Sequence, residues 1–321
     1  MDSIENQNNN HLDTDWTIKG YIAAPLTGFN QDKTVNLSTV APYAEMLKCG
    51  GVVGVFVNGT TGEGMSLTAD ERMELAELWV KQKADDFKVI IHVGYGEQTL
   101  GLQLAKHAVD IGADAIGEIG PMINQPSTVE ALVAYSTRTA AAASALPYYY
   151  YHMPSLNNIT FPMADYLACG ANKIPNFQGI KYTYEDLDDY AKCVQFDHKR
   201  FDIAFGRDEL LIKALPLGAQ GGVGSTFNFM APLYNELTCA FHAGDMDKAA
   251  ALQNLSIAAI DLLVGTDNFF SALKTVVGHM GIDLGPVRDP QVNLQPAAKE
   301  KLLNDLQAIG AFAYLNNTIS K

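Results

Sequence analysis

The side chain best suited to covalent chemistry is Lys181, in the segment Phe177 to Thr183. The segment has the composition of a buried strand, and since side chains alternate along a strand, Gly179, Lys181 and Thr183 share one face. Burial disfavours the ammonium form, lowers the pKa of a lysine and leaves an amine that can form a Schiff base with a ketone. Alternatively, Lys181 faces outward and extends its amine to solvent between helices. The strand pattern alone favours neither orientation.

Tyrosines occupy positions 148 to 151 of another predicted strand, directly before His152. Tyr149 and Tyr151 share a face of that strand. A phenol at the end of the strand could relay protons near the amine of Lys181. Consecutive tyrosines are more often packing residues, and this interpretation stays open for each of them.

A glycine-rich turn, Asn58 to Gly64, carries the adjacent threonines Thr60 and Thr61 and precedes a predicted helix over Leu67 to Ala84. Hydroxyl and free amide groups at a helix entrance suit a small anion. Without the lysine of a P-loop, we expect a carboxylate and not a triphosphate. The alternative is a tight turn that binds nothing.

The segment Phe205 to Glu209 ends in two carboxylates, Asp208 and Glu209. They could bind the hydroxyls of a polyol, or they could be acidic residues at a helix N-terminus, where the helix dipole favours negative charge. Neither Gly221 to Thr226 nor Gly94 to Gly96 has the spacing of a dinucleotide fingerprint. The seven histidines show no metal-binding spacing. We therefore expect no nucleotide cofactor and no catalytic metal.

These segments belong to a repeating pattern that predicts the fold. Short β-branched or aromatic runs alternate with segments of helical period, which is typical of a parallel sheet with helical crossovers. Eight such runs occur, and eight βα units suggest a closed barrel. The runs are Lys19 to Pro25, Val52 to Asn58, Val89 to Gly94, Ala115 to Gly120, Pro147 to His152, Phe177 to Thr183, Phe201 to Gly206 and Gly221 to Thr226.

The intervening helices carry capping signals. Thr68 with Glu71, and Ser127 with Glu130, each match a capping box, and Gly112 suits a helix C-terminus. Apolar residues at helical spacing form a stripe expected to face the barrel wall: Leu100, Leu104, Ala108 and Ile111.

The pattern predicts an α/β protein, a (β/α)8 TIM barrel over residues 16–228 with a C-terminal helical extension over 229–321 and a disordered polar tail over 1–15. Active sites of such barrels lie at the C-terminal ends of the strands, where the candidate residues above fall. The expected C-terminal helices are Pro232 to Ala243, Asp247 to Val264, Asn268 to Met280 and Pro296 to Ala311.

Composition restricts the partners of the chain. Its 321 residues include 36 acidic and 22 basic side chains, a net charge of −14, which argues against binding to nucleic acid or anionic lipid. The four cysteines lack zinc-ligand spacing and suit a reducing compartment. No apolar run reaches the roughly 18 residues of a membrane span, and the first residues are polar and acidic, unlike a signal peptide. We expect a cytoplasmic protein.

Four motifs, taken in chain order, resemble the pyruvate-dependent class I aldolases of the N-acetylneuraminate lyase and dihydrodipicolinate synthase family. They are G-T-T-G-E after the second strand, Tyr-x-x-Pro after the fifth, G-I-K-Y-T in the sixth and G-x-D-E after the seventh. The resemblance extends over nearly the whole chain from about residue 18. It implies that Lys181 forms the Schiff base and that Tyr151 moves the proton of the substrate C4 hydroxyl.

The resemblance also implies the substrate contacts. Thr60 and Thr61 would receive the substrate carboxylate, and Thr60 would also hydrogen-bond to Tyr151. The contacts to an open-chain sugar would come from Thr183, Gly206, Asp208, Glu209 and Ser225.

The segments Tyr150 to Pro154 and Gly206 to Glu209 are similar to the family members that cleave sialic acid, especially the animal ones. The implied reaction is retro-aldol cleavage of ring-opened N-acetylneuraminate to N-acetylmannosamine and pyruvate. It needs no metal or diffusible cofactor, and the implied assembly is a homotetramer.

The chain departs from the family pattern at two places. Many bacterial relatives place tyrosines after the fourth strand, inserted into the neighbouring subunit's site, where this chain has Gly120 to Asn124. The synthases carry an arginine for a second carboxylate where this chain has Leu156, which argues against their substrate.

Two alternatives remain open: another pyruvate aldolase acting on a different aldehyde or 2-keto sugar acid, and a non-catalytic barrel that senses a keto acid or sialic acid. Lys181 and Tyr151 favour an enzyme, because a binding site needs neither a covalent amine nor a proton shuttle.

Overall fold

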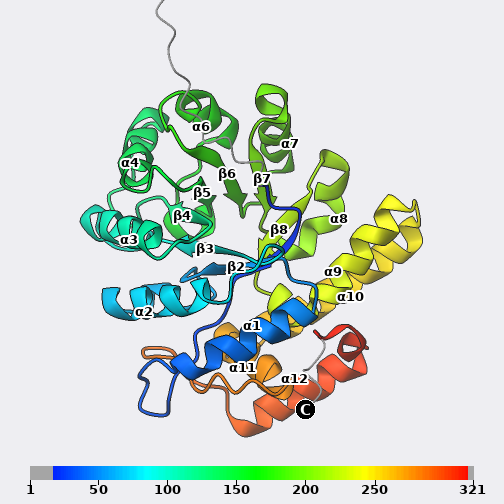
Figure 1. Cartoon of the computed structure of the whole chain (residues 1–321). Coiled ribbons are helices and arrows are strands. Elements are labelled where there is room, and N and C mark those ends of the chain that lie inside the picture. The colour runs from blue at the N-terminus through cyan, green and yellow to red at the C-terminus, as the bar shows by residue number, and fades with distance from the viewer. Residues whose placement is uncertain (1–16, 317–321) are drawn as a thin grey trace, which may run out of the picture.

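The structure, a computed structural model, describes residues 17–316 and contains a closed barrel of eight parallel strands (Figure 1). Each strand pairs with the next along the chain, and β8 pairs with β1 to close the barrel. All eight predicted runs are confirmed as strands, with slightly shorter bounds, except that β3 begins one residue earlier than predicted, at Lys88. The strands are β1 Gly20–Ala23, β2 Gly54–Val57, β3 Lys88–His92, β4 Ala115–Ile119, β5 Tyr148–His152, β6 Phe177–Tyr182, β7 Asp202–Phe205 and β8 Gly221–Gly224.

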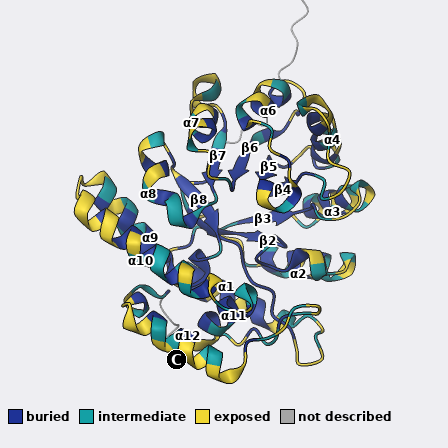
Figure 2. Cartoon of the chain, turned by 180° about the vertical axis from the view of Figure 1, so that it is seen from behind, coloured by how far each residue is buried: buried dark blue, intermediate teal, exposed yellow. Residues whose placement is uncertain are grey.

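Helices surround the strands, so the strands are buried almost throughout and the helices expose their outer faces (Figure 2). This arrangement is that of a TIM barrel. The helices up to β8 are α1 Val40–Cys49, α2 Ala69–Val80, α3 Gln98–Asp110, α4 Val129–Ala142, α5 Pro154–Asn157, α6 Met163–Gly170, α7 Leu187–Gln195 and α8 Leu211–Ala214.

The core has two layers, and strand β5 contributes to both. Tyr149 and Tyr151 belong to the cluster inside the barrel, whereas Tyr148 and Tyr150 pack between the strands and the helices. The alternation expected of the tyrosine run is therefore confirmed. Since side chains fill the barrel interior, reactive groups can lie only near its open end.

The capping predictions are partly confirmed. Thr68 and Glu71 form the capping box of α2, and Gly112, at φ 76°, follows α3. In the α3 stripe, Leu104 and Ala108 are buried, while Leu100 and Ile111 are partly buried against the same core.

The capping box predicted at Ser127 and Glu130 is wrong by one residue. Thr128 is the N-cap of α4, because it is the residue with extended backbone and its hydroxyl accepts a hydrogen bond from the Ala131 amide at 3.2 Å.

The C-terminal helices are α9 Phe227–His242, α10 Met246–Val264, α11 Phe269–His279 and α12 Pro296–Ala308. Helix α9 begins at Phe227, earlier than predicted, because Pro232 lies within the helix and the non-helical backbone of Met230 accommodates it. Helix α9 also packs against β1, so it completes the ring of helices around the barrel. Helices α10, α11 and α12 pack on one another beyond that ring (Figure 1).

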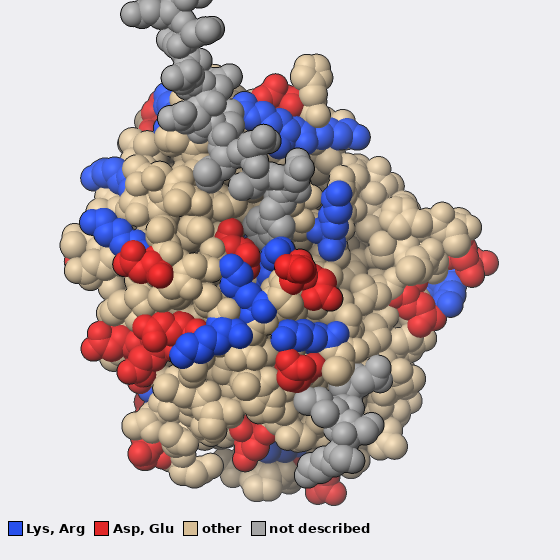
Figure 3. Space-filling view, in the orientation of Figure 1, with Lys and Arg blue, Asp and Glu red and all other residues tan. Residues whose placement is uncertain are grey.

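The predicted N-terminal tail lies outside the described residues. On the face seen in Figure 3, acidic and basic side chains are interspersed. Within residues 17–316, no single helix is long and apolar enough to span a membrane, and α10 and α11 reach that length and composition only as a pair bent by 117°.

Candidate active site

A cavity of about 390 Å³ opens at the C-terminal ends of the strands. The turn after β2 and the ends of β5, β6, β7 and β8 form most of its wall, and α10 and α11 add apolar side chains. All nine residues predicted for the site line this cavity: Lys181, Tyr151, Thr60, Thr61, Thr183, Gly206, Asp208, Glu209 and Ser225.

Lys181 points into the barrel, which resolves the two orientations that the strand pattern left open. The residue is 5% exposed, and its Nζ lies 4.0 Å from the ring centroid of Tyr151 and 4.4 Å from that of Phe56. Burial lowers the pKa of Lys181 from 10.5 to about 7, while the negative charge of Asp208 acts in the opposite direction. A substantial share of the lysine is therefore a free amine at neutral pH, the form that attacks a carbonyl.

Asp208 presents a carboxylate to the same cavity. Its Oδ2 accepts hydrogen bonds from the Thr226 amide at 3.1 Å and the Thr226 hydroxyl at 2.6 Å. Burial raises the pKa of Asp208 to about 6, against the hydrogen bonds from Thr226, which lower it. A Cβ atom at position 224 would lie 2.0 Å from Asp208 Oδ1, so Gly224 is required for the carboxylate to occupy this place.

The mouth of the cavity carries a second carboxylate and a cation. Glu209 Oε1 lies 2.9 Å from the guanidinium of Arg207, which also lines the cavity but was not singled out from the sequence. Both side chains are about one third exposed, so the pair stays accessible to solvent and to a ligand. At Gly206, a Cβ atom would lie 2.0 Å from Thr183 Oγ1, so glycine leaves room for that hydroxyl beside the cavity.

The turn after β2 brings its two threonines to different partners. Thr61 Oγ1 lies 2.8 Å from the hydroxyl of Ser225, and Thr60 Oγ1 lies 3.4 Å from the Tyr151 hydroxyl, the contact that the resemblance implies. Tyr151 donates to Met153 Sδ at 2.9 Å. Burial raises the pKa of Tyr151 to about 12, and its hydrogen bonds with Thr60 and Thr183 lower it.

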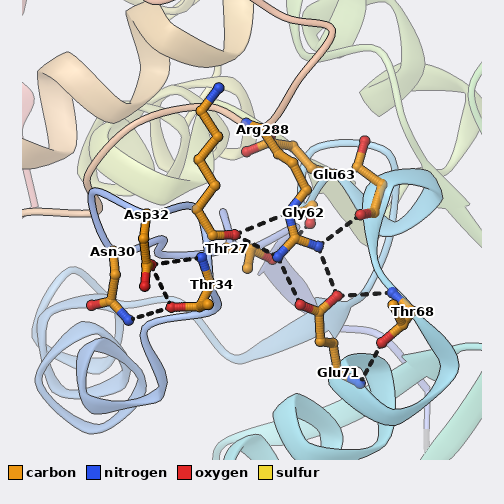
Figure 4. A network of polar contacts seen from close by, with 11 residues as sticks. Thr27, Asn30, Asp32, Thr34, Gly62, Glu63, Thr68, Glu71 and Arg288 are labelled. Carbon is orange, nitrogen blue, oxygen red and sulfur yellow. Dashed lines mark hydrogen bonds and ion pairs between the residues drawn. The ribbon is translucent and has the colours of Figure 1, made fainter.

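Charged residues of the C-terminal extension hold this turn in place. Glu63, in the left-handed region at φ 54°, ends the turn and forms a buried ion pair with Lys274 of α11, with 2.7 Å between Glu63 Oε1 and Nζ. The Arg288 amide donates to Glu63 Oε2 at 3.3 Å, and its guanidinium binds both oxygens of Glu71 at 2.7 Å (Figure 4). Phe29 contacts both cations, at 4.4 Å and 4.6 Å. Removing one partner of a buried pair costs about 3–5 kcal/mol, so the turn is rigidly anchored.

Several residues of the site carry no functional signal in the sequence. Phe269 and Phe270, from the segment that begins α11, line the cavity together with Ile260 and Val264 of α10. Their sequence signal was that of ordinary amphipathic helices, which says nothing of where a helix packs. Tyr95 lies in the segment Gly94 to Gly96, which lacks the spacing of a nucleotide motif, yet its hydroxyl hydrogen-bonds to Thr60.

Comparison with known proteins agrees with this geometry. The model of the dihydrodipicolinate synthetase family matches residues 17–309. N-acetylneuraminate lyase A of Xenopus laevis is 40% identical, covering 85% of this chain and 90% of the relative, and N-acetylneuraminate lyase of Rattus norvegicus is 38% identical, covering 89% and 90%. The structure of Proteus mirabilis N-acetylneuraminate lyase superposes with a TM-score of 0.88 at 35% identity, covering 91% of this chain and 99% of the other. The chain therefore belongs to the dihydrodipicolinate synthetase family.

Proposed function

We propose that this chain is a class I aldolase that reversibly cleaves N-acetylneuraminate to N-acetylmannosamine and pyruvate. The observation that carries the proposal is the buried amine of Lys181, with its pKa lowered to about 7, directly over the ring of Tyr151. The relatives at 38–40% identity are N-acetylneuraminate lyases, which supports this substrate over others of the family.

The first step of the proposed mechanism is formation of an imine. The free amine of Lys181 attacks C2 of the ring-opened substrate, and the carbonyl oxygen leaves as water. The substrate carboxylate binds in the turn at Thr60 and Thr61, where hydroxyl and amide groups donate hydrogen bonds.

The second step breaks the bond between C3 and C4. Tyr151, as the phenolate, takes the proton of the C4 hydroxyl, C4 becomes the aldehyde of N-acetylmannosamine, and the bond electrons pass to the protonated imine nitrogen. Tyr151 then returns this proton to C3 of the enamine, and water hydrolyses the imine, which releases pyruvate and restores the amine of Lys181.

The polar residues at the mouth would hold the open-chain sugar. Asp208 and Glu209 accept hydrogen bonds from hydroxyls, while Thr183 and Ser225 can donate or accept. Leu156 is partly buried against the barrel interior and offers no charge for a second carboxylate, which further separates this site from that of the synthases.

Release of pyruvate from N-acetylneuraminate tests the proposal directly. We expect continuous release, measured by a coupled enzyme that reduces pyruvate, with equimolar N-acetylmannosamine. If borohydride traps pyruvate on the chain but N-acetylneuraminate is not cleaved, the chain is an aldolase for another substrate. If neither occurs, the chain is a binding protein and the proposal fails.

Substrate choice is expected to depend on the two carboxylates at the mouth. Asp208→Asn and Glu209→Gln should each lower kcat/KM for N-acetylneuraminate about tenfold or more, because each loses a charge-assisted hydrogen bond of roughly 1.5–3 kcal/mol. Trapping of pyruvate by borohydride should barely change, because pyruvate reaches only Lys181 and the turn.

Glu185→Gln is the matched control, because Glu185 also faces Arg207, at 3.9 Å, but is mostly exposed and does not line the cavity. Its kcat/KM should stay within about twofold of the unmodified chain. Should Asp208→Asn and Glu209→Gln impair trapping as much as cleavage, these carboxylates support the fold or the amine and do not select the sugar.

The homotetramer that the family resemblance implies, and the cytoplasmic location that the composition favours, are further parts of this proposal. Light scattering of the purified chain tests the first, and localisation of a tagged chain in its native cell tests the second.

A further inference from the structure

Tyr95 lies on the loop between β3 and α3, behind the wall of the cavity. Its hydroxyl hydrogen-bonds to Thr60 Oγ1, the atom that also faces the Tyr151 hydroxyl at 3.4 Å. Thr60 thus lies between two tyrosines, one that lines the cavity and one that does not. Neither the proposed imine chemistry nor the sugar contacts assign any task to Tyr95.

The backbone is strained to place this tyrosine. Tyr95 adopts φ 80°, a conformation that is uncommon for a bulky residue and that marks functional sites more often than chance. Its ring centroid lies 4.4 Å from that of His92, and the ring packs against the cluster inside the barrel. The preceding glycine leaves room beside the same histidine, since a Cβ atom at Gly94 would lie 3.0 Å from the His92 ring.

The hydrogen bond between Tyr95 and Thr60 decides which atom the Thr60 hydroxyl can donate its own proton to. Burial raises the pKa of Tyr95 well above its usual value, so at neutral pH the phenol keeps its proton. A buried phenol needs an acceptor for that proton, and since its hydroxyl is in hydrogen-bond contact with Thr60 Oγ1, we take Tyr95 as the donor of this bond. The hydroxyl of Thr60 then has its own proton free to donate to the Tyr151 oxygen. Such a donor stabilises the phenolate form of Tyr151, which the second step of the reaction requires.

We propose that Tyr95 is a positioning residue of the aldolase reaction, which orients the Thr60 hydroxyl as a hydrogen-bond donor to Tyr151 within a single chain. The inference rests on the proposed function. In this proposal the second tyrosine comes from the β3–α3 loop, since the segment 120–124 after β4 contains no tyrosine and exposes Ile123.

The variant Tyr95→Phe tests the inference, because it keeps the ring beside His92 and removes only the hydroxyl. Cleavage of N-acetylneuraminate is measured together with deuterium incorporation into the methyl group of pyruvate in D₂O, which needs the imine and a proton transfer but no sugar. We expect kcat and the exchange rate to fall about tenfold, with KM within about twofold and borohydride trapping unchanged.

The comparison with Thr60→Val separates an action through Thr60 from general loosening of the loop. In the Thr60→Val background, adding Tyr95→Phe should lower kcat and the exchange rate no further, because the hydroxyl that hydrogen-bonds to both tyrosines is already absent. Tyr184→Phe is the control, since Tyr184 packs on His152 and does not line the cavity. It should leave both rates unchanged.

Two results would overturn the inference: rates for Tyr95→Phe within about twofold of the unmodified chain, or an equal loss in both backgrounds. The exchange measurement also separates this inference from the proposed function. If the chain exchanges pyruvate protons but does not cleave N-acetylneuraminate, the proposed substrate is wrong, and the role of Tyr95 is still decided by exchange.

Discussion

Lys181→Ala should lose all but a trace of N-acetylneuraminate cleavage and all trapping of pyruvate by borohydride. Among the residues of 17–316 that line the cavity, Lys181 alone carries a primary amine from which an imine can form, and alanine supplies no nucleophile. In the unmodified chain, reduction with borohydride and pyruvate should add a fixed mass that peptide mapping assigns to Lys181. Lys181→Arg should be equally inactive, because a guanidinium stays protonated.

Lys274 provides an internal control for this experiment. It is also buried, but its Nζ is held by Glu63 at 2.7 Å and by the carbonyl oxygen of Pro286 at 2.8 Å. Burial lowers the pKa of Lys274 too, while the charge of Glu63 opposes the shift and the ion pair keeps the ammonium form. An adduct on Lys274, or on any lysine other than Lys181, would refute the assignment of the nucleophile.

The pKa of Lys181 also determines how the rate of imine formation should depend on pH. Because the pKa of Lys181 is lowered to about 7, the reactive free amine predominates above pH 7 and gives way to the ammonium ion below it. The rate of imine formation with pyruvate should therefore fall about tenfold per pH unit below 7. A rate that still rises steeply up to pH 10 would mean that Lys181 has the pKa of an ordinary exposed lysine.

The features of the fold and the site that depend only on residues close together in the sequence could be predicted from its periodicity. Alternation within β5 and β6 specifies which side chains face the barrel interior, and the position of Lys181 near a strand end places it by the mouth. Both inferences need only a few adjacent residues. The shift from Ser127 to Thr128 as N-cap shows the limit, since both residues can cap a helix and only the backbone conformation selects one.

Contacts between distant residues could not be predicted in this way. Glu63 and Lys274 pair across most of the chain, and nothing in the sequence around either residue identifies the other. The same holds for the apolar side chains of α10 and α11 over the cavity, because a helix of suitable period packs equally well elsewhere. Tyr95 was visible as a tyrosine between two glycines, but its significance comes from Thr60, which lies on another βα loop.

Tyr151→Phe should keep the imine and lose cleavage. The phenol contributes nothing to attack at C2, so borohydride should still trap pyruvate on Lys181. The proton of the C4 hydroxyl, however, has no acceptor once the oxygen is removed, and loss of a general acid or base costs about 10² to 10⁴ in rate. The measurement is kcat for pyruvate release beside the yield of reduced adduct.

Tyr149→Phe is the sharpest control for this loss, because Tyr149 shares the strand and the inward face of Tyr151. Its hydroxyl donates to Asp202 Oδ2 at 2.7 Å, deeper in the barrel and outside the cavity. Removing it should lower the free energy of unfolding by about 1 kcal/mol, since a partly buried carboxyl loses a donor, and should leave kcat nearly unchanged. If Tyr149→Phe reduced cleavage as much as Tyr151→Phe, the defect would come from disturbed barrel packing, and the proton shuttle would have to be sought in another residue.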